Sequence, residues 1–419
     1  MAQFKIKGGN PLKGTIKVSG NKNSALPLIA ASLVVDGPVK LTNVPNIRDV
    51  ESAVELIEKL GVKVAGLGTG TLEIDASDLT GSDIDPDLAR KFRASVIFAA
   101  PLLARFGKIT LPSPGGDSIG ERLIDTHFQL LSEFGASIKE KDGIYEITAT
   151  NLKVADIFLE KASVTATEMG LILASTLPGE TIIEDAAAEP HVKDLAEFLV
   201  KAGAQIEGAG TNTIIINGKK SLKGVEHKVR PDHIEVGTFA IAAAITGGNV
   251  RIEGAVADDL DMILLYLSDM GVKYKLDDNV LSVIPSELVE IRKEFHTRPW
   301  PGFPTDLMSA FIVLATQTKG VTLCHDWMYE WRIFFVDYLI KMGADITIAD
   351  PHRIIVTGPT KLHGEIIPTT DIRAGVALIL AALVAEGNST VEHAEIVERG
   401  YEDLETRLSA LGAQIEKVE

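Results

Sequence analysis

The residues with the clearest chemical potential are cations that stand where helices are expected to begin. Helix starts carry partial positive charge and free N–H groups, so they bind phosphate and carboxylate, and arginine adds paired hydrogen bonds to the same anions. The cations are Lys22, Arg122, Arg332, Arg373 and Arg399. Such a set indicates a ligand with several negative groups. The interspersed Asp306 and Asp371 could take a proton from a hydroxyl.

Asp117 raises a separate question, because it lies in the proline- and glycine-rich stretch LPSPGGDSIGERLID (residues 111–125). An aspartate before an amphipathic run is most often a helix cap. Ser118 and Glu121, however, already have the spacing of a capping box. We therefore expect a helix that opens near Asp117, with Asp117 itself left for chemistry. His127 falls on the apolar face of this run, so a packed histidine is expected there.

The composition restricts the class of ligand. The net charge is −17, which excludes broad electrostatic attraction to nucleic acid or anionic lipid. The single cysteine, Cys324, follows the strand-like VTL and is expected to be buried, and one cysteine permits neither an intramolecular disulfide nor an all-cysteine metal site. No phosphate-loop, dinucleotide or metal-ligand motif occurs, so we expect no organic cofactor and no obligatory metal. Without an apolar signal or membrane segment, a cytoplasmic setting is expected.

A repeated unit must position these residues. Six segments end a helix-like pattern with a glycine and then begin a strand-like one, at intervals of 68 to 74 residues. Their glycines, which suit the left-handed position after a helix, are Gly61, Gly135, Gly203, Gly271, Gly343 and Gly412. The unit reads helix, strand, helix, strand, strand, and its first helix is apolar on nearly every side and should be buried.

Six such units fill the 419 residues, and 46% hydrophobic content is ample for two cores. We expect one domain over residues 22–229, which carries a loop at 111–123, and a second over 1–21 plus 230–419. The N-terminal strand QFKIKG would complete the second domain. Charged groups at equivalent helix starts should then face one cleft between the domains. The tryptophans Trp300, Trp327 and Trp331 are expected in the core or in the cleft wall.

Ten short motifs along the whole chain resemble those of the enolpyruvyl transferases, in the branch that acts on a nucleotide sugar. They are SGNKNSALP, FRAS, PGGDSIGERLIDTH, KASV, AAAEPHVKDL, RPDHIEVGTFAIAAA, PGFPTD, YEWR, TDIRAG and ERGYE. A single motif of this kind is weak evidence for the family, but ten motifs in the family's order are specific evidence for it. The resemblance implies an α/β fold, an inside-out α/β barrel in which two domains of three repeats close on the substrates.

The resemblance also implies a reaction. The 3-hydroxyl of UDP-N-acetylglucosamine adds to C2 of phosphoenolpyruvate, and the tetrahedral ketal then loses phosphate, as the first committed step of peptidoglycan synthesis. Asp306 is implied as the base at the hydroxyl, and Lys22 and Asp117 as proton donors. Arg399 completes the implied catalytic set. Asp117 falls where most members carry a cysteine, and its proline- and glycine-rich setting suits a lid that closes over the substrate.

The binding sets follow from the same resemblance, position by position. The set implied for phosphoenolpyruvate is Lys22, Asn23, Arg122, Arg332, Arg373 and Arg399. The set implied for UDP-N-acetylglucosamine is Asn23, Arg93, Arg122, Asp125, Lys161, Ser163, Val164, Asp306 and Met328. The expected partners are these two small-molecule substrates, with no nucleic acid and no membrane, and the oligomeric state cannot be read from the sequence.

Several positions depart from the family's pattern around the nucleotide. They are Leu123 for a common proline, Thr165 for a glycine, Ala188 and His233 for arginines, and Ile396 for a histidine. Three alternatives therefore remain: enolpyruvyl transfer to shikimate 3-phosphate, transfer to another nucleotide, and a non-catalytic sugar-nucleotide sensor. The motif SGNKNSALP favours the nucleotide-sugar branch over the first. The presence of Lys22, Asp306 and Arg399 argues against the third.

Overall fold

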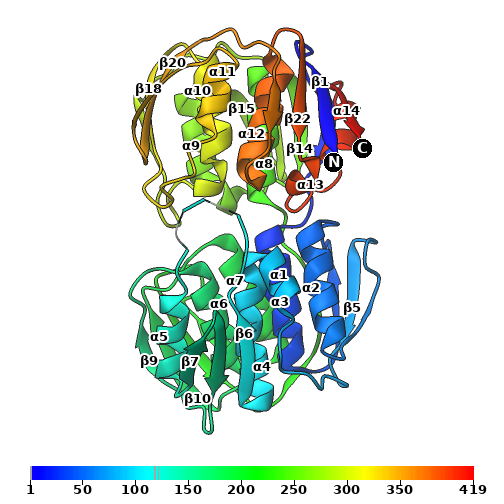
Figure 1. Cartoon of the computed structure of the whole chain (residues 1–419), viewed down its shortest axis with the longest axis vertical. Helices are drawn as coiled ribbons and strands as arrows, with labels where there is room; N and C mark the ends of the chain where they lie inside the picture. Colours follow the sequence, from blue (N-terminus) through cyan, green and yellow to red (C-terminus); the bar gives the residue numbers. More distant parts are fainter. Residues whose placement is uncertain (1, 118, 121) are drawn as a thin grey trace. The chain divides into compact units, whose positions relative to one another are not determined.

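The computed structural model describes residues 2–117, 119–120 and 122–419, and in it the chain forms two units (Figure 1). The central unit comprises Gly20–Asp117 and Arg122–Arg230. The terminal unit, which holds both chain ends, comprises Met1–Ser19, Ser118–Glu121 and Pro231–Glu419. The boundaries expected from the sequence, 21/22 and 229/230, lie within two residues of the limits near residues 20 and 230.

The central unit consists of three sheets with strand orders β13-β3-β5-β4, β6-β8-β7 and β11-β12-β10-β9. Its helices are α1 (Lys22–Ala31), η1 (Ser32–Val34), α2 (Arg48–Lys59), α3 (Pro86–Lys91), η2 (Arg93–Phe98), α4 (Ala99–Phe106), α5 (Asp125–Glu133), α6 (Val164–Ser175) and α7 (Pro190–Ala202). Its strands are β3 (Val35–Thr42), β4 (Lys63–Ala65), β5 (Thr71–Asp75), β6 (Lys108–Pro112), β7 (Ser137–Lys141), β8 (Ile144–Thr148), β9 (Asp156–Phe158), β10 (Gly179–Glu184), β11 (Gln205–Glu207), β12 (Thr213–Gly218) and β13 (Leu222–Lys228).

The terminal unit repeats this plan with sheets β15-β16-β14-β2, β17-β18-β20-β19 and β21-β22-β1-β23. Its helices are α8 (His233–Ile245), η3 (Ala257–Asp259), α9 (Asp261–Asp269), η4 (Thr305–Leu307), α10 (Met308–Gln317), α11 (Val336–Lys341), α12 (Ile372–Val384), α13 (Ala394–Val397) and α14 (Leu404–Ala410). Its strands are β1 (Gln3–Lys7), β2 (Lys13–Lys17), β14 (Asn249–Glu253), β15 (Lys273–Asp277), β16 (Val280–Ile284), β17 (Glu294–His296), β18 (Gly320–His325), β19 (Asp345–Asp350), β20 (Arg353–Gly358), β21 (Ile366–Pro368), β22 (Asn388–Glu392) and β23 (Gln414–Val418).

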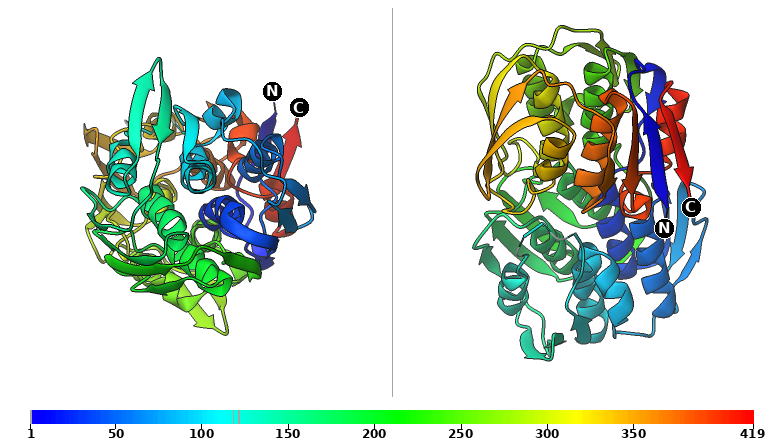
Figure 2. Two further views of the ribbon diagram at one scale, coloured as in Figure 1. Left: turned by 90° about the horizontal axis from the view of Figure 1, so that it is seen from below. Right: turned by 45° about the horizontal axis from the view of Figure 1, so that its top comes forward.

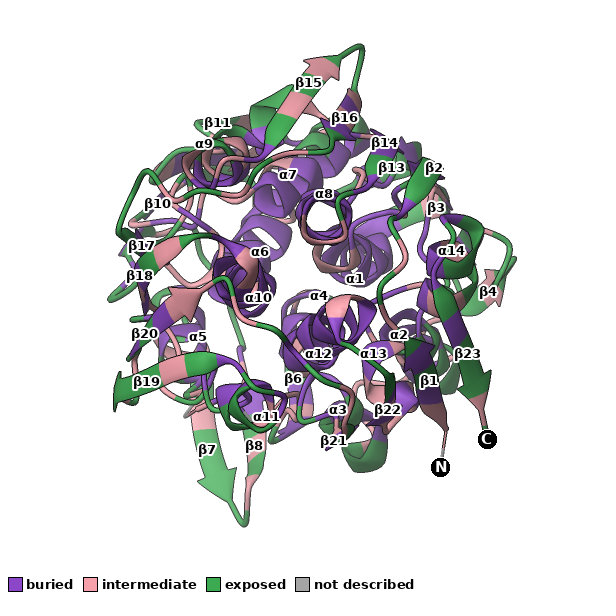
Figure 3. Ribbon diagram, turned by 90° about the horizontal axis from the view of Figure 1, so that it is seen from above, coloured by how far each residue is buried: buried purple, intermediate pink, exposed green. Residues whose placement is uncertain are grey.

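The first helix of each repeat is buried, as its apolar sequence predicts. In the terminal unit α8, α10 and α12 pack against one another, and Figure 3 shows their residues in the buried colour. The sheets lie outside these helices and expose one face to solvent. The expected inside-out α/β arrangement of six repeats is therefore confirmed, since a helix that is hydrophobic all round is stable only inside a core.

Local signals in the repeats also behave as predicted. The six helix-ending glycines all adopt positive φ, between 80° and 120°. The N-terminal strand β1 pairs antiparallel with both β22 and β23, so the two chain ends meet in one sheet (Figure 2). Cys324 lies on β18 with none of its side chain exposed, and burial raises the pKa of its thiol.

Candidate functional site

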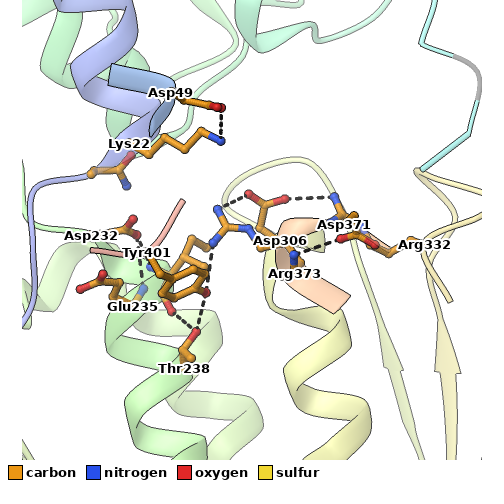
Figure 4. A network of polar contacts seen from close by, with 12 residues as sticks. Lys22, Asp49, Asp232, Glu235, Thr238, Asp306, Arg332, Asp371, Arg373 and Tyr401 are labelled. Atoms are coloured by element: carbon orange, nitrogen blue, oxygen red, sulfur yellow. Dashed lines mark hydrogen bonds and ion pairs between the residues drawn. The ribbon is translucent and has the colours of Figure 1, made fainter. Parts of the chain in front are cut away.

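A carboxylate between two arginines is the chemical centre of the terminal unit (Figure 4). Asp306 Oδ1 lies 3.1 Å from Arg332 Nη2, and Asp306 Oδ2 lies 2.8 Å from Arg373 Nη2. Both guanidinium groups are almost fully buried, whereas the Asp306 side chain keeps 26% of its surface exposed. A carboxylate held on one side by two buried cations and open on the other can still accept a proton from a neighbouring molecule.

Short structural elements place the three residues. Asp306 lies in η4, the single turn that precedes α10, and Arg373 lies in the first turn of α12. Asp371 caps α12, because its Oδ1 accepts hydrogen bonds of 3.0 Å from the backbone N–H groups of Arg373 and Ala374. Arg332 lies in the turn before α11.

Arg373 is fixed from behind by a buried hydroxyl pair. Its Nη1 donates to Tyr401 Oη at 3.1 Å, and Tyr401 Oη lies 2.9 Å from Thr238 Oγ1 on α8. Burial alone would lower the pKa of the Arg373 guanidinium, but the charges of Asp306, Tyr401 and Asp232 outweigh it and raise that pKa. Arg373 therefore stays charged, and its guanidinium has one favoured orientation.

The start of α8 carries a second acidic group. Asp232 caps the helix, and its Oδ1 accepts from the backbone N–H groups of Ile234 and Glu235. Burial and the neighbouring Glu235 raise the pKa of Asp232 to about 6, against the opposing effect of Arg373. Glu235 binds Arg407 through both carboxylate oxygens, at 2.8 and 2.9 Å, and accepts from the backbone N–H of Ser19.

In the central unit, Lys22 opens α1 and forms an ion pair with Asp49. Lys22 Nζ lies 2.6 Å from Asp49 Oδ2, and the exposed fractions of the two side chains are 13% and 4%. Asn21 caps α1 through a bond from Ser24 N, and Asn23 follows Lys22 in the first turn. The structure thus gives Lys22 a buried counter-ion in the first turn of α2.

Three cations expected at the nucleotide lie around one buried histidine. Burial chiefly, and then the charges of Arg93, Lys161 and Arg122, lower the pKa of His127 to about 3. His127 is 4% exposed, and its Nε2 lies 2.7 Å from Thr165 Oγ1. The histidine is packed, as predicted, and its neutral ring adds no further positive charge to this cationic neighbourhood.

The N-terminus of α6 lies in the same neighbourhood. Ser163 caps α6 through a bond of 3.4 Å from Ala166 N, and Val164 is the first helical residue. A helix start of this kind presents free N–H groups to an anion. Asp125, the first residue of α5, is exposed. The expected nucleotide residues of the central unit thus come from η2, the segment before α5, and the starts of α5 and α6.

The expected helix at Asp117 is wrong. Among the described residues between β6 and Asp125 (113–117, 119–120 and 122–124) none is helical, and α5 begins at Asp125 without a side-chain cap. The capping pair Ser118 and Glu121 lies outside the described residues. Arg93 Nη2 donates to the carbonyl oxygens of Arg122 and Leu123, so these carbonyls bind a side chain, and residues 122–124 are not helical.

Two glycines allow the chain before Asp117 to lie close to α3 and η2. A Cβ at Gly115 would come within 1.8 Å of the Arg90 carbonyl oxygen, and one at Gly116 within 2.9 Å of Arg93 Cβ. Gly116 also has a φ angle of +117°, which residues other than glycine rarely adopt. Past Asp117, Ile119 is buried, and its carbonyl oxygen accepts from Trp331 N at 3.4 Å within the terminal unit.

Two further placements need correction. Arg332 and Arg399 do not open helices: Arg332 precedes α11 by four residues, and Arg399 lies in a turn after α13. The backbone is left-handed at His393, just before α13, and at Asp403, just before α14, with φ of 60° and 41°. Of the two placements expected for the tryptophans, core or cleft wall, the core is excluded for Trp327 and Trp331, because 48% and 49% of their surfaces are exposed. Met328 is half-buried beside them.

Sequence reasoning missed two partners, Asp49 and Tyr401. Asp49 stands at the start of the second helix of the first repeat, the locus at which the other repeats carry their polar residues, so a signal was present. Tyr401 is part of the ERGYE motif. Over residues 2–117, 119–120 and 122–419, no group of three or more His, Cys, Asp or Glu side chains could hold a metal ion. Within those ranges, no helix is both long and apolar enough to cross a membrane.

Comparison with known proteins identifies the family to which the chain is similar. The family model for EPSP synthase (3-phosphoshikimate 1-carboxyvinyltransferase) matches residues 6–408. A UDP-N-acetylglucosamine 1-carboxyvinyltransferase of Bradyrhizobium diazoefficiens is 47% identical, covering 99% of this chain and 98% of its own. One of Halothermothrix orenii is 45% identical and covers 100% of both chains.

Solved structures agree with the fold. The enolpyruvyl transferase NikO from Streptomyces tendae has a TM-score of 0.89 at 26% identity, covering 100% of this chain and 99% of its own. EPSP synthase from Acinetobacter baumannii has a TM-score of 0.79 at 21% identity, with full coverage of both chains, which concerns the fold alone. The family resemblance drawn from the ten motifs is confirmed: this chain belongs to the EPSP synthase family of enolpyruvyl transferases.

Proposed function

We propose that the protein transfers the enolpyruvyl group of phosphoenolpyruvate to the 3-hydroxyl of UDP-N-acetylglucosamine and releases phosphate. The observation that carries the proposal is the convergence of Arg332 and Arg373 on Asp306, at 3.1 and 2.8 Å. In this arrangement the two arginines can bind a substrate carboxylate, and Asp306 beside them can accept the proton of a hydroxyl. The names of the full-length relatives support the acceptor.

The two arginines give Asp306 a means of activation. Each guanidinium binds one oxygen of Asp306 in the structure, and pairing with cations makes a carboxylate a weaker base. The carboxylate of phosphoenolpyruvate competes for the same guanidinium groups. When it binds there, Asp306 loses part of its pairing and becomes more basic. The base is thus activated when the second substrate is in place.

The reaction proceeds in two steps. In the addition step Asp306 takes the proton of the 3-hydroxyl, the hydroxyl oxygen bonds to C2, and C3 receives a proton from Lys22 or Asp117. In the elimination step C3 loses a proton and phosphate leaves with a proton supplied by the protein. Lys22, with its ion pair to Asp49, is a preorganised cation for the phosphate. Arg122 and Arg399 complete the phosphate contacts, and Asn23 and Met328 contact the sugar.

The uridine nucleotide lies, in this proposal, against Arg93, Arg122, Lys161 and the start of α6. The electrostatic effect of all three cations on His127 supports a common neighbourhood. Val164 contributes a backbone N–H group beside the Ser163 side chain, which caps α6, and Asp125 contributes a carboxylate at the start of α5. We keep the cytoplasm as the proposed location, because the single thiol is buried and the chain has no disulfide to need an oxidising compartment.

A second candidate is transfer to a different nucleotide. Thr165 stands where the family resemblance implies a glycine, and its hydroxyl bonds His127 beside the three cations. A hydroxyl-bearing side chain there changes the shape of the nucleotide site. The experiment that separates the candidates measures phosphate release from phosphoenolpyruvate with UDP-N-acetylglucosamine, UMP and shikimate 3-phosphate side by side. We expect turnover with the first; turnover with UMP or with shikimate 3-phosphate, but not with UDP-N-acetylglucosamine, would overturn the proposal.

A further inference from the structure

We propose that Asp326 is a positioning residue that holds Asp306 and Arg332 in register for the transfer reaction. The inference rests on the roles proposed above for those two residues. Asp326 directly follows β18 and is fully buried. A buried carboxylate is costly unless hydrogen bonds satisfy it, and Asp326 is satisfied by donors from three separate segments.

The four donors identify what Asp326 connects. Its Oδ1 accepts from Thr297 Oγ1 at 3.1 Å, from Met328 N at 3.0 Å and from Tyr329 N at 3.2 Å. Its Oδ2 accepts from Thr305 Oγ1 at 2.5 Å. Thr305 is the residue before Asp306 in η4, and Met328 and Tyr329 begin the turn that carries Arg332.

These bonds close a ring through the reactive pair. The carboxylate of Asp326 binds both the η4 segment and the 328–332 turn. Asp306 from the first segment then meets Arg332 from the second, with 3.1 Å between Oδ1 and Nη2. The Arg332 guanidinium also lies over the ring of Tyr329, 5.3 Å from its centroid. Displacement of either segment therefore changes the distance between the base and its arginine.

Asp326 is itself anchored to the sheet. Its backbone N–H donates to the carbonyl oxygen of His352 at 2.9 Å, and its own carbonyl oxygen accepts from His352 Nδ1 at 2.7 Å. His352 lies just before β20, which pairs with β18. The Asp326 carboxylate thus fixes η4 and the 328–332 turn relative to a rigid sheet. Turns need such support to hold reacting groups in place.

A simpler reading is that Asp326 only caps the turn after β18. Bonds from Met328 N and Tyr329 N are sufficient for that purpose. The bond from Thr305 is not part of such a turn, because it joins residues 21 apart in sequence. It is also the shortest of the four. The cap explains the bonds from Met328 and Tyr329, and the positioning of Asp306 explains the bond from Thr305.

The test compares two threonines that donate to the same carboxylate. Thr305→Val and Thr297→Val each delete one hydroxyl donor and keep the β-branched shape. Only Thr305 adjoins the proposed base. We expect Thr305→Val to lower kcat about tenfold, with KM for both substrates changed less than about twofold, because misplacing a reacting group acts on the chemical step. Its pH–rate profile should shift on the acidic limb, which reports the base.

The matched variant and a conservative replacement complete the design. Thr297→Val should keep kcat within about twofold of the parent while its Tm falls as much as that of Thr305→Val. Thr305→Ser keeps the hydroxyl and should restore kcat. If Thr305→Val does not fold, Thr305→Ala replaces it in the comparison. Equal kcat in the two valine variants, or no recovery with serine, would overturn the inference.

Asp306→Asn in the same series separates the two proposals. If Asp306→Asn is inactive while Thr305→Val matches the parent in kcat and pH profile, Asp326 does not position the base and the proposed reaction stands. If Asp306→Asn turns over normally, the base is elsewhere and the proposed role of Asp306 fails. In that case a kcat loss in Thr305→Val would no longer support the inference either.

Discussion

Arg373 and Asp306 form a direct ion pair, with Nη2 2.8 Å from Oδ2, and Tyr401 holds the other side of the same guanidinium. The base and the cation that is proposed to bind the substrate carboxylate are therefore coupled before the reaction begins. Any change to Asp306 also affects the charge balance of two buried arginines.

Asp306→Asn should abolish turnover and leave the fold intact. The amide cannot accept the hydroxyl proton, and its Nδ2 group would face a guanidinium. We expect a loss in kcat of at least about 10³-fold, and a lowered Tm because two buried arginines lose a counter-charge. Phosphate release and circular dichroism measure the two effects. Retained turnover would mean that the proton goes to another group.

Asp49→Asn tests the Lys22 ion pair. Removing one partner of a buried pair leaves the other charge uncompensated, so we expect a loss of about 3 kcal/mol in the free energy of unfolding. Binding of phosphoenolpyruvate should also weaken. Asp78→Asn is the matched control, because Lys63–Asp78 has the same 2.6 Å separation but side chains 72% and 59% exposed. That exposed pair should contribute little to stability, so equal losses of the two variants in urea titrations would contradict the expectation.

His127 should make the central unit sensitive to acid. Burial, assisted by Arg93, lowers the pKa of His127 to about 3, below its unfolded value of about 6.5. The unfolded chain then binds more protons between these values, so the contribution of His127 to stability is complete above pH 6.5 and is lost as the pH falls toward 3.

The variant His127→Asn should flatten this dependence. Between pH 7.5 and 4 the parent's Tm should fall more steeply than that of the variant, as followed by thermal denaturation. Parallel curves would show that the histidine does not titrate as described. His363, whose side chain is 54% exposed, offers a control substitution of a histidine at the surface.

Asp117 predicts insensitivity to fosfomycin. That epoxide alkylates the cysteine thiolate found at this position in most of the family, and a carboxylate is a far weaker nucleophile. Asp117→Cys should therefore gain time-dependent inactivation, and the parent enzyme should show none at the same drug concentration. Progressive inactivation of the parent would refute the prediction. Asp117→Asn would show in parallel whether the carboxyl group carries a proton during turnover.

The repeated glycines and the apolar runs of the sequence predicted the six repeats and the ends of their second helices. The six glycines fix the ends of second helices, because the φ values they adopt suit glycine alone. The apolar first helices fix the interior of each unit. These signals are local, so a single sequence suffices to read them.

Helix starts at the site were less predictable, because distant side chains decide them. Arg93 takes the carbonyls of Arg122 and Leu123, which a longer α5 would have needed. The pairs Lys22–Asp49 and Arg373–Tyr401 were missed for the same reason: spacing indicates the face on which a residue lies but not its partner. The position of Asp326 likewise follows from tertiary packing.

The burial of Cys324 has a consequence for survival under oxidative attack. Hydrogen peroxide and electrophilic metabolites act on accessible thiolates, and the single sulfhydryl of this chain lies inside a sheet with its pKa raised. A carboxylate at position 117 cannot be converted to a sulfenic acid. We expect this enzyme to keep its turnover at peroxide concentrations that inactivate relatives with a reactive cysteine.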